Sequence, residues 1–239
     1  TINPGTAGGG METVVGDDCL LMASSHVAHD CRLGNHVILA NYVGVAGHAT
    51  IGDHVTFGGT CVVHQFVRVG AHAFIGAQSM VDADVIPYGM AVGNRARLAG
   101  LNLVGLKRRG FEREAIQTLR AAYRMIFSSE GTLRERVDDA ALMFRDQPLV
   151  QDVVGFISSS ADRPLCLIAG SGALVPEVIA AAQGRGYLMQ VLSLEQRRSI
   201  AGVSAQPFNL ARPDEAVAHL RSFGPTMIAM AGGLHLSDR

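Results

Sequence analysis

The feature that most constrains this chain is a sequence period of six residues. An aliphatic or similar residue occupies every sixth position over residues 15–87: Val15, Leu21, Val27, Leu33, Leu39, Val45, Ile51, Phe57, Val63, Val69, Ile75 and Val81, with a misfit at Pro87. A second column of mostly small or apolar residues lies two positions earlier, as at Cys31, Ala49 and Cys61. Such a hexapeptide period predicts a parallel β-helix, in which each hexapeptide supplies one short strand and one corner.

The period also predicts how the chain stacks. Three hexapeptides complete one triangular coil, so stacked residues lie 18 positions apart, and neighbouring coils hydrogen-bond as strands about 4.8 Å apart. Residues 15–87 therefore supply about four coils. The Gly-rich segment from Thr1 to Thr13 has no helical pattern and is expected to be an irregular loop that leads into the solenoid.

Composition excludes several classes of protein. The chain has 239 residues, 48% of them hydrophobic and 17% charged, which suits a soluble chain with a sizeable core. The net charge of −1 gives no bulk attraction to nucleic acid. The longest apolar stretch, near Leu165 to Val175, is too short and Gly-rich to span a membrane, and no signal peptide opens the chain. Three cysteines lie on the inward small-residue column and are expected to be unpaired, so we expect a cytoplasmic protein.

Helices are expected after the repeat, and then alternating strands and helices. The helices are predicted over 111–128, over 132–144 with Thr132 and Glu135 as a capping box, and over 148–158 with Pro148 at its start. A Ser-rich linker follows at 158–164. Strands are expected over 165–169, 188–194 and 226–231, with helices over 174–183 and 213–223. This alternation predicts a small parallel α/β layer of Rossmann-like type.

Polar residues suited to catalysis gather on one edge of the predicted solenoid. Stacking by 18 places His29, Gly47 and Gln65 in one column, Asp30 and His48 in the next, and His64 on the other side. An imidazole at such an edge can act as a general base near neutral pH. Surface histidines at a corner would explain any one of them alone, but three converging histidines favour a functional site.

Several segments resemble a known family. HVAHDC, ILANYVGVAGHATIGD, GGTCVVHQF and GLNLVGLKRRGF are similar to bacterial UDP-N-acetylglucosamine O-acyltransferase, the first enzyme of lipid A synthesis, over about residues 1–163. The resemblance implies transfer of a 3-hydroxyacyl group from acyl carrier protein, through its phosphopantetheine arm, to the sugar 3-hydroxyl, without a metal or other cofactor. It also implies a homotrimer with active sites between subunits. Family members have further coils before the position of Thr1, so we expect this chain to be incomplete and poorly active by itself.

The resemblance implies roles for particular residues. It implies that His29 is the catalytic base, that Asp30 orients it, and that the Gly47 backbone N–H is the oxyanion donor. The residues that it assigns to substrate binding are His26, His48, His64, Gln65, the acyl-chain ruler Ala77, the nucleotide contacts Asn102 and Arg109, and the donor-phosphate contact Arg108. The run Lys107-Arg108-Arg109 agrees, because guanidinium groups bind phosphate in a bidentate way.

The last part of the chain resembles a different lipid A enzyme. LCLIAGSGALVPEVIAAAQGRGY and MIAMAGGLH are similar to the N-terminal domain of the alternative UDP-2,3-diacylglucosamine pyrophosphatase, which is unrelated to calcineurin-like phosphoesterases. That family's catalytic domain is not in this sequence. We therefore expect three domains: a left-handed parallel β-helix over 1–92, an α-helical domain over 93–163 and a small, partial α/β domain over 164–239.

Other interpretations stay open. A fused bifunctional lipid A protein, a non-catalytic scaffold and the N-acyltransferase of the same pathway are alternatives. A zinc hydratase of the γ-carbonic anhydrase type also uses a left-handed β-helix, but it pairs two ligands five residues apart, and no two of the nine histidines here have that spacing.

Overall fold

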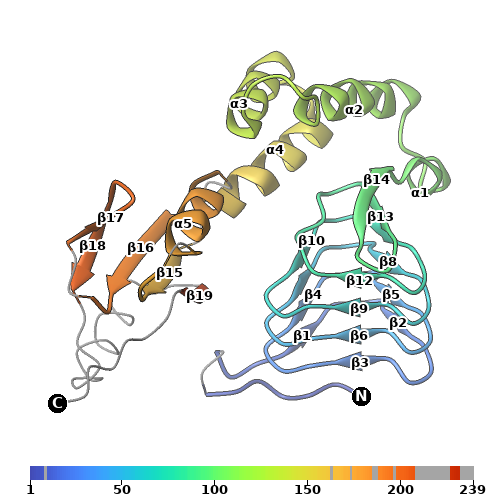
Figure 1. Ribbon diagram of the computed structural model, residues 1–239. Coiled ribbons are helices and arrows are strands. Elements are labelled where there is room, and N and C mark those ends of the chain that lie inside the picture. The colour runs from blue at the N-terminus through green and yellow to red at the C-terminus, as the bar shows by residue number, and fades with distance from the viewer. Residues whose placement is uncertain are drawn as a thin grey trace. The chain divides into compact units, whose positions relative to one another are not determined.

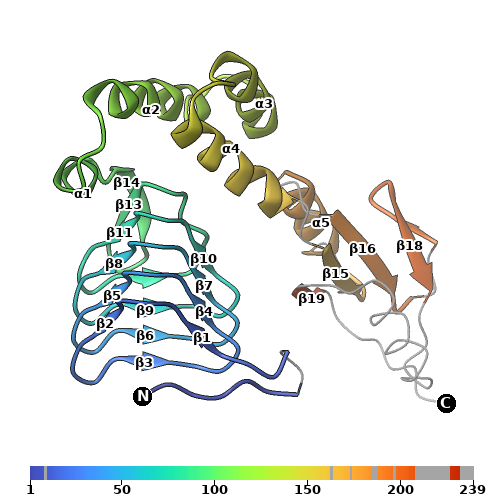
Figure 2. The same ribbon diagram turned by 180° about the vertical axis from the view of Figure 1, so that it is seen from behind.

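The computed structural model describes residues 1–7, 10–161, 164–172, 174–184, 188–195, 198–207 and 227–231. The chain divides into two compact units, Thr1–Phe156 and Ile157–Arg239, and each is described by itself (Figures 1 and 2). None of the described helices is long and apolar enough to cross a membrane.

The first unit is built on the predicted left-handed parallel β-helix. Twelve two-residue strands stack in three parallel sheets, with each strand paired to the one 18 residues along, as in Val14 with Arg32. These strands are β1 (Val14–Val15), β2 (Leu20–Leu21), β3 (His26–Val27), β4 (Arg32–Leu33), β5 (Ile38–Leu39), β6 (Gly44–Val45), β7 (Thr50–Ile51), β8 (Thr56–Phe57), β9 (Val62–Val63), β10 (Arg68–Val69), β11 (Phe74–Ile75) and β12 (Met80–Val81). Figure 1 shows the coils rising from the N-terminus.

Both predicted columns point into the solenoid. The aliphatic column, including Leu39, Ile51 and Phe57, and the small-residue column, including Val37 and Cys61, form one buried core. Burial of a large apolar side chain contributes about 1.5–3 kcal/mol, so this stack is the main source of stability in the unit. All four cysteines are free; Cys31, Cys61 and Cys166 are buried and Cys19 is partly exposed.

The corners repeat one backbone conformation. Every sixth residue from Asp18 to Gln78 has a φ near +60°, including Asp30 (φ 59°) and His48 (φ 61°), although none of these corner residues is glycine. This left-handed conformation turns the chain from one sheet to the next, and it is costly for most side chains.

The N-terminal segment differs from the expected irregular loop. Ile2 forms a parallel bridge with Val27, and the Val27 N–H donates to Thr1 O while the Asn3 N–H donates to Val27 O, both at 2.9 Å. Residues 1–3 therefore extend the sheet of β3. The two bridged residues are separated by a number that is not a multiple of six, so the period did not reveal this pairing.

The solenoid ends in an antiparallel hairpin that the sequence did not predict. Strands β13 (Gly89–Val92) and β14 (Arg97–Leu101) pair with each other, and β13 also pairs in parallel with β11. Four helices follow: α1 (Leu103–Arg108), α2 (Arg113–Ile126), α3 (Leu133–Met143) and α4 (Pro148–Ala161). Helix α3 has the predicted capping box of Thr132 and Glu135. Helix α1 was not predicted, because six residues are too few to show a helical period.

The second unit contains a five-stranded sheet. Its elements are β15 (Pro164–Ala169), α5 (Leu174–Gly184), β16 (Leu188–Ser193), β17 (Ser199–Ile200), β18 (Val203–Pro207) and β19 (Met227–Ala231). The strand order is β17-β18-β16-β15-β19, and only the β17–β18 pair is antiparallel. The predicted helix over 213–223 lies outside the described residues, and the Rossmann-like assignment stays a prediction.

Candidate active site

The predicted catalytic residues lie at one corner of the β-helix, which we call the first corner. It consists of the turns at residues 29–30, 47–48 and 65–66, which follow β3, β6 and β9. The His48 N–H donates to His29 O and the Phe66 N–H donates to Gly47 O, both at 3.1 Å, so the three turns stack directly. The 18-residue register thus brings His29 and Gly47 together.

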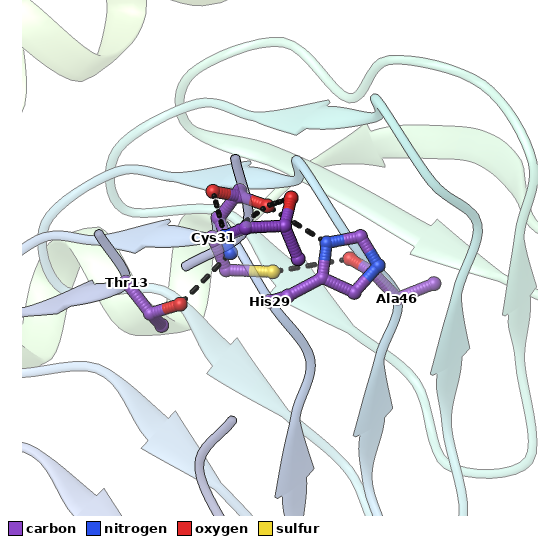
Figure 3. A network of polar contacts seen from close by, with 6 residues as sticks. Thr13, His29, Cys31 and Ala46 are labelled. Carbon is purple, nitrogen blue, oxygen red and sulfur yellow. Dashed lines mark hydrogen bonds and ion pairs between the residues drawn. The ribbon is translucent and has the colours of Figure 1, made fainter. Parts of the chain in front are cut away.

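The centre of the first corner is a pair formed by His29 and Asp30. His29 Nδ1 lies 2.8 Å from Asp30 Oδ2. The Asp30 side chain is fully buried, whereas 41% of the His29 side chain is exposed. Figure 3 shows the polar contacts around this pair, with Thr13, His29, Cys31 and Ala46 labelled. The imidazole therefore reaches solvent with one nitrogen while the other meets a buried carboxylate.

Two threonines that the sequence did not single out hold Asp30. The Thr6 hydroxyl donates to Asp30 Oδ2 at 2.6 Å, and the Thr6 backbone N–H lies 3.0 and 3.2 Å from the two carboxylate oxygens. Thr13 Oγ1 accepts from the Asp30 backbone N–H at 2.8 Å (Figure 3). Thr6 lies before the hexapeptide repeat, and Thr13 lies two positions before Val15, in line with the small-residue column, but no role was predicted for either.

These bonds keep Asp30 ionised. The hydrogen bond from the Thr6 hydroxyl is the largest influence, and with the Thr6 backbone N–H and His29 it lowers the pKa of Asp30 from 3.8 to about 2, against the opposing effect of burial. An ionised carboxylate only accepts hydrogen bonds, so His29 must donate through Nδ1. The Nε2 lone pair is then left available.

Gly47 lies directly against the His29 ring. A Cβ placed on Gly47 would lie 2.6 Å from His29 Cε1 and 2.8 Å from His29 Nε2. Among the described residues, the Gly47 N–H donates to no backbone carbonyl, whereas those of Ala46 and His48 donate to Val63 O and His29 O. The absence of a side chain lets the imidazole cover the turn beside an unused backbone donor.

Other predicted residues lie on the strands and turns of the same corner. The His48 ring meets the His29 ring edge-on, with centroids 5.1 Å apart, and stacks on Phe66 at 4.6 Å. His64 follows β9, with its Nδ1 3.2 Å from Gln65 O. His26 lies in β3, with its Nδ1 2.7 Å from Thr1 Oγ1. Phe66 ends the segment GGTCVVHQF that carries part of the resemblance, but no role was predicted for it.

The remaining predicted residues lie at the other two corners of the same chain. Ala77 is exposed in the turn after β11, at the second corner. Asn102 and Arg109 lie at the third corner, the one that contains His54 and His72. Asn102 caps α1 by accepting from the Gly105 N–H at 3.0 Å and donates to His72 O at 2.9 Å. A single chain therefore does not bring the candidate base, the acyl ruler and the nucleotide contacts together.

The third corner is a stack of rings. His36, His54 and His72 lie face to face, with centroids 4.5 and 4.7 Å apart, and Tyr88 continues the stack. Burial lowers the pKa of His72 to about 4, with smaller contributions from the charges of His54 and Arg109. Arg109 donates from Nη2 to His54 O at 2.8 Å, while its buried Nη1 has no partner among the described residues. Arg108 is exposed in the last turn of α1.

One group at the first corner has donor atoms that suit a metal. Donor atoms of His29, Asp30 and His48 lie within 4.8 Å of one another. However, the Asp30 carboxylate already accepts bonds from Thr6 and His29, and it is fully buried. The arrangement resembles a hydrogen-bonded acid–base pair more closely than three converging zinc ligands.

Comparisons with known proteins match both parts of the chain. Residues 12–47 match the bacterial transferase hexapeptide family, and residues 84–166 match domain 2 of UDP-N-acetylglucosamine O-acyltransferase. Residues 164–238 match the LpxI N-terminal domain.

The individual proteins that are similar to this chain belong to the same acyltransferase family. The acyl-[acyl-carrier-protein]–UDP-N-acetylglucosamine O-acyltransferase of Agrobacterium fabrum is 50% identical over 169 residues, which cover 69% of this chain and 61% of that protein. The UDP-N-acetylglucosamine O-acyltransferase structure from Moraxella catarrhalis is 40% identical, with a TM-score of 0.64, covering 66% of this chain and 62% of that one. The Arabidopsis UDP-N-acetylglucosamine acyltransferase is 42% identical, with a TM-score of 0.61, covering 62% and 54%.

The chain therefore spans about three fifths of the length of the curated relatives that it matches. The agreement of family, sequence and fold confirms the resemblance to the UDP-N-acetylglucosamine O-acyltransferase family over the first two thirds of the chain, and the likeness of residues 164–238 to an LpxI N-terminal domain.

Proposed function

We propose that this protein transfers a 3-hydroxyacyl group from acyl carrier protein to the 3-hydroxyl of UDP-N-acetylglucosamine, the first step of lipid A synthesis. The observation that carries the proposal is the first corner, where a buried, ionised Asp30 holds a half-exposed His29 against Gly47. The relatives whose printed names describe this reaction support it.

In this proposal His29 is the general base. Asp30 holds the proton on Nδ1, so Nε2 takes the proton of the sugar 3-hydroxyl as its oxygen attacks the thioester carbonyl. The Gly47 N–H donates to the oxygen of the tetrahedral intermediate, because it donates to no backbone carbonyl of the described residues and lies beside the base. The imidazolium then returns its proton to the thiolate of the phosphopantetheine arm as the thioester bond breaks. No metal or other cofactor takes part.

The remaining predicted residues are proposed to bind the substrates. His26, His48, His64 and Gln65 lie near the base and hold the sugar and the acyl group, and Ala77 limits the length of the acyl chain. Asn102 and Arg109 contact the nucleotide, and Arg108 the phosphate of the donor arm. Because these residues occupy three corners of one chain, we propose a homotrimer in which corners of neighbouring copies face each other and complete each site.

The test is acyl transfer by the purified protein and by His29→Ala. Loss of a general base lowers kcat by roughly 10²–10⁴-fold. The control is Arg134→Ala, because Arg134 is an exposed residue of α3 that contacts Asp138 and has no predicted role in the site. A surface substitution of this kind should change kcat by less than about twofold. Near-normal turnover by His29→Ala would remove this residue from the mechanism.

A second function receives slight support from the match of residues 164–238 to the LpxI N-terminal domain. A fused protein with a UDP-diacylglucosamine pyrophosphatase part stays the alternative, and we do not assign hydrolysis to this chain, because the match covers only an N-terminal domain. The proposed division is a β-helix over 1–92, a helical domain over 93–163 and the α/β domain over 164–239. The cytoplasmic location stays a prediction.

A further inference from the structure

A loop at the start of the chain reaches the candidate base through Asp30. Residues 5–7 and 10–13, the described parts of this segment, which we call the N-terminal loop, both contact this residue. Thr6 at one end binds the carboxylate through its hydroxyl and its backbone N–H, and Thr13 at the other end accepts from the Asp30 backbone N–H. The loop thus holds the side chain and the main chain of one buried residue at the same time.

The ends of the N-terminal loop are fixed close to each other. The Met11 N–H donates to Thr6 O at 3.1 Å. A Cβ on Gly5 would lie 1.9 Å from Glu12 N, so the two ends are in direct backbone contact and no side chain fits between them. Thr6 is therefore placed by the backbone rather than by a flexible side-chain arrangement.

We propose that Thr6 is a positioning residue, which holds the Asp30 carboxylate so that Asp30 fixes the orientation and the protonated nitrogen of His29. Oδ2 of Asp30 accepts from both Thr6 Oγ1, at 2.6 Å, and His29 Nδ1, at 2.8 Å. The Thr6 hydroxyl thus fixes the position of the same carboxylate oxygen that accepts from the imidazole. This inference rests on the proposed function for its effect on turnover, but its geometric content concerns only Thr6, Asp30 and His29.

The hydroxyl of Thr6 has a role that its backbone N–H does not fill. The N–H lies almost equally far from the two carboxylate oxygens, so it places the group without selecting one oxygen. The hydroxyl binds Oδ2 alone. Without it, the carboxylate can rotate, and a rotated Asp30 no longer requires the proton to stay on Nδ1.

The test uses Thr6→Val, which removes the hydroxyl and keeps the shape and the backbone N–H. We expect kcat to fall about tenfold with little change in KM, the effect of one hydrogen bond to a charged group. Thr6→Ser restores the hydroxyl and should recover kcat to within about twofold of the original protein. Thr50→Val is the matched control, because Thr50 is exposed in β7, and it should leave kcat unchanged within about twofold.

A second measurement does not depend on turnover. In protein labelled with ¹⁵N-histidine, the His29 signals are assigned by their absence in His29→Gln, and they report which ring nitrogen carries the proton. We expect Nδ1–H in the original protein and in Thr6→Ser, and a larger share of Nε2–H in Thr6→Val. If Thr6→Val does not fold, Thr6→Ala is measured in the same way.

The outcomes separate this inference from the proposed function. Unchanged kcat and an unchanged His29 tautomer in Thr6→Val overturn the role of Thr6, as does a Thr6→Ser variant that is as impaired as Thr6→Val. If the original protein transfers no acyl group, the proposed function fails, and the tautomer comparison alone decides whether Thr6 positions the pair.

Discussion

Replacing Gly47 with alanine tests the geometry of the first corner most directly. The new Cβ would lie 2.6 Å from His29 Cε1, and ordinary carbon–carbon contacts lie at about 3.5–4.0 Å. The ring must therefore move by about 1 Å, and a displacement of that size costs about 10²-fold in rate. Because alanine keeps the backbone N–H, the loss cannot be assigned to a missing oxyanion donor.

Two other glycines of the solenoid provide controls for this substitution. A Cβ on Gly44 would meet Val62 at 3.8 Å, an ordinary contact, so Gly44→Ala should leave kcat and stability nearly unchanged. A Cβ on Gly52 would lie 2.6 Å from Ala71 N, so Gly52→Ala should lower stability without disturbing His29. The assay is kcat for acyl transfer beside the urea midpoint of unfolding. A Gly47→Ala protein with kcat within about twofold of the original would refute the argument.

Three further predictions concern other contacts. The pKa of Asp30 is lowered in the folded state, so its ionic contribution to stability is fully present above pH 3.8 and is lost as the pH falls towards 2. Urea unfolding should therefore show Thr6→Val destabilised at pH 6 and much less destabilised near pH 2. Ala77→Met should shift donor preference to a shorter 3-hydroxyacyl chain and Ala77→Gly to a longer one, since each buried CH₂ is worth about 0.8 kcal/mol; unchanged profiles in a competition assay would exclude Ala77 from the pocket wall. Tyr88→Phe removes the hydrogen bond to Asp152 and should lower the unfolding free energy by about 1–2 kcal/mol, measured by urea denaturation.

Metal content provides a separate prediction. The zinc hydratase alternative requires a stoichiometric ion, whereas the hydrogen-bonded pair requires none. Elemental analysis of protein purified without chelators should find less than about 0.1 zinc per chain, and turnover should survive dialysis against a chelator. One zinc per chain, lost together with activity, would favour the hydratase.

The solenoid could be predicted from the sequence because every hexapeptide of a β-helix has the same packing requirement. Each inward position, such as Leu39 or Val63, must be apolar. Because one coil takes 18 residues, the period alone identifies which residues stack on each other in successive coils. The same register was enough to bring His29 beside Gly47. The helix over Leu133–Met143 was predictable because its capping box is local.

Features outside the register could not be found in this way. Thr6 reaches Asp30 from a segment that belongs to no hexapeptide, and nothing in its local sequence distinguishes it from other loop threonines. Strand β14 pairs antiparallel in a structure whose pattern is parallel, and a hairpin of four and five residues carries little periodic signal. The roles of Asn102 and Arg109 depend on neighbours that a single chain does not supply.

The left-handed corners place selection for stability and selection for activity in opposition. Asp30 and His48 both occupy positions with φ near +60°, where a non-glycine residue costs roughly 1–2 kcal/mol. Glycine would relax the backbone at His48 but would remove the ring that meets His29. A library of variants selected only for heat resistance should therefore accumulate glycine or asparagine at the corner positions. Corner positions that keep their original residue when the same library is selected for growth would mark the functional edge of the solenoid without any assay of the enzyme.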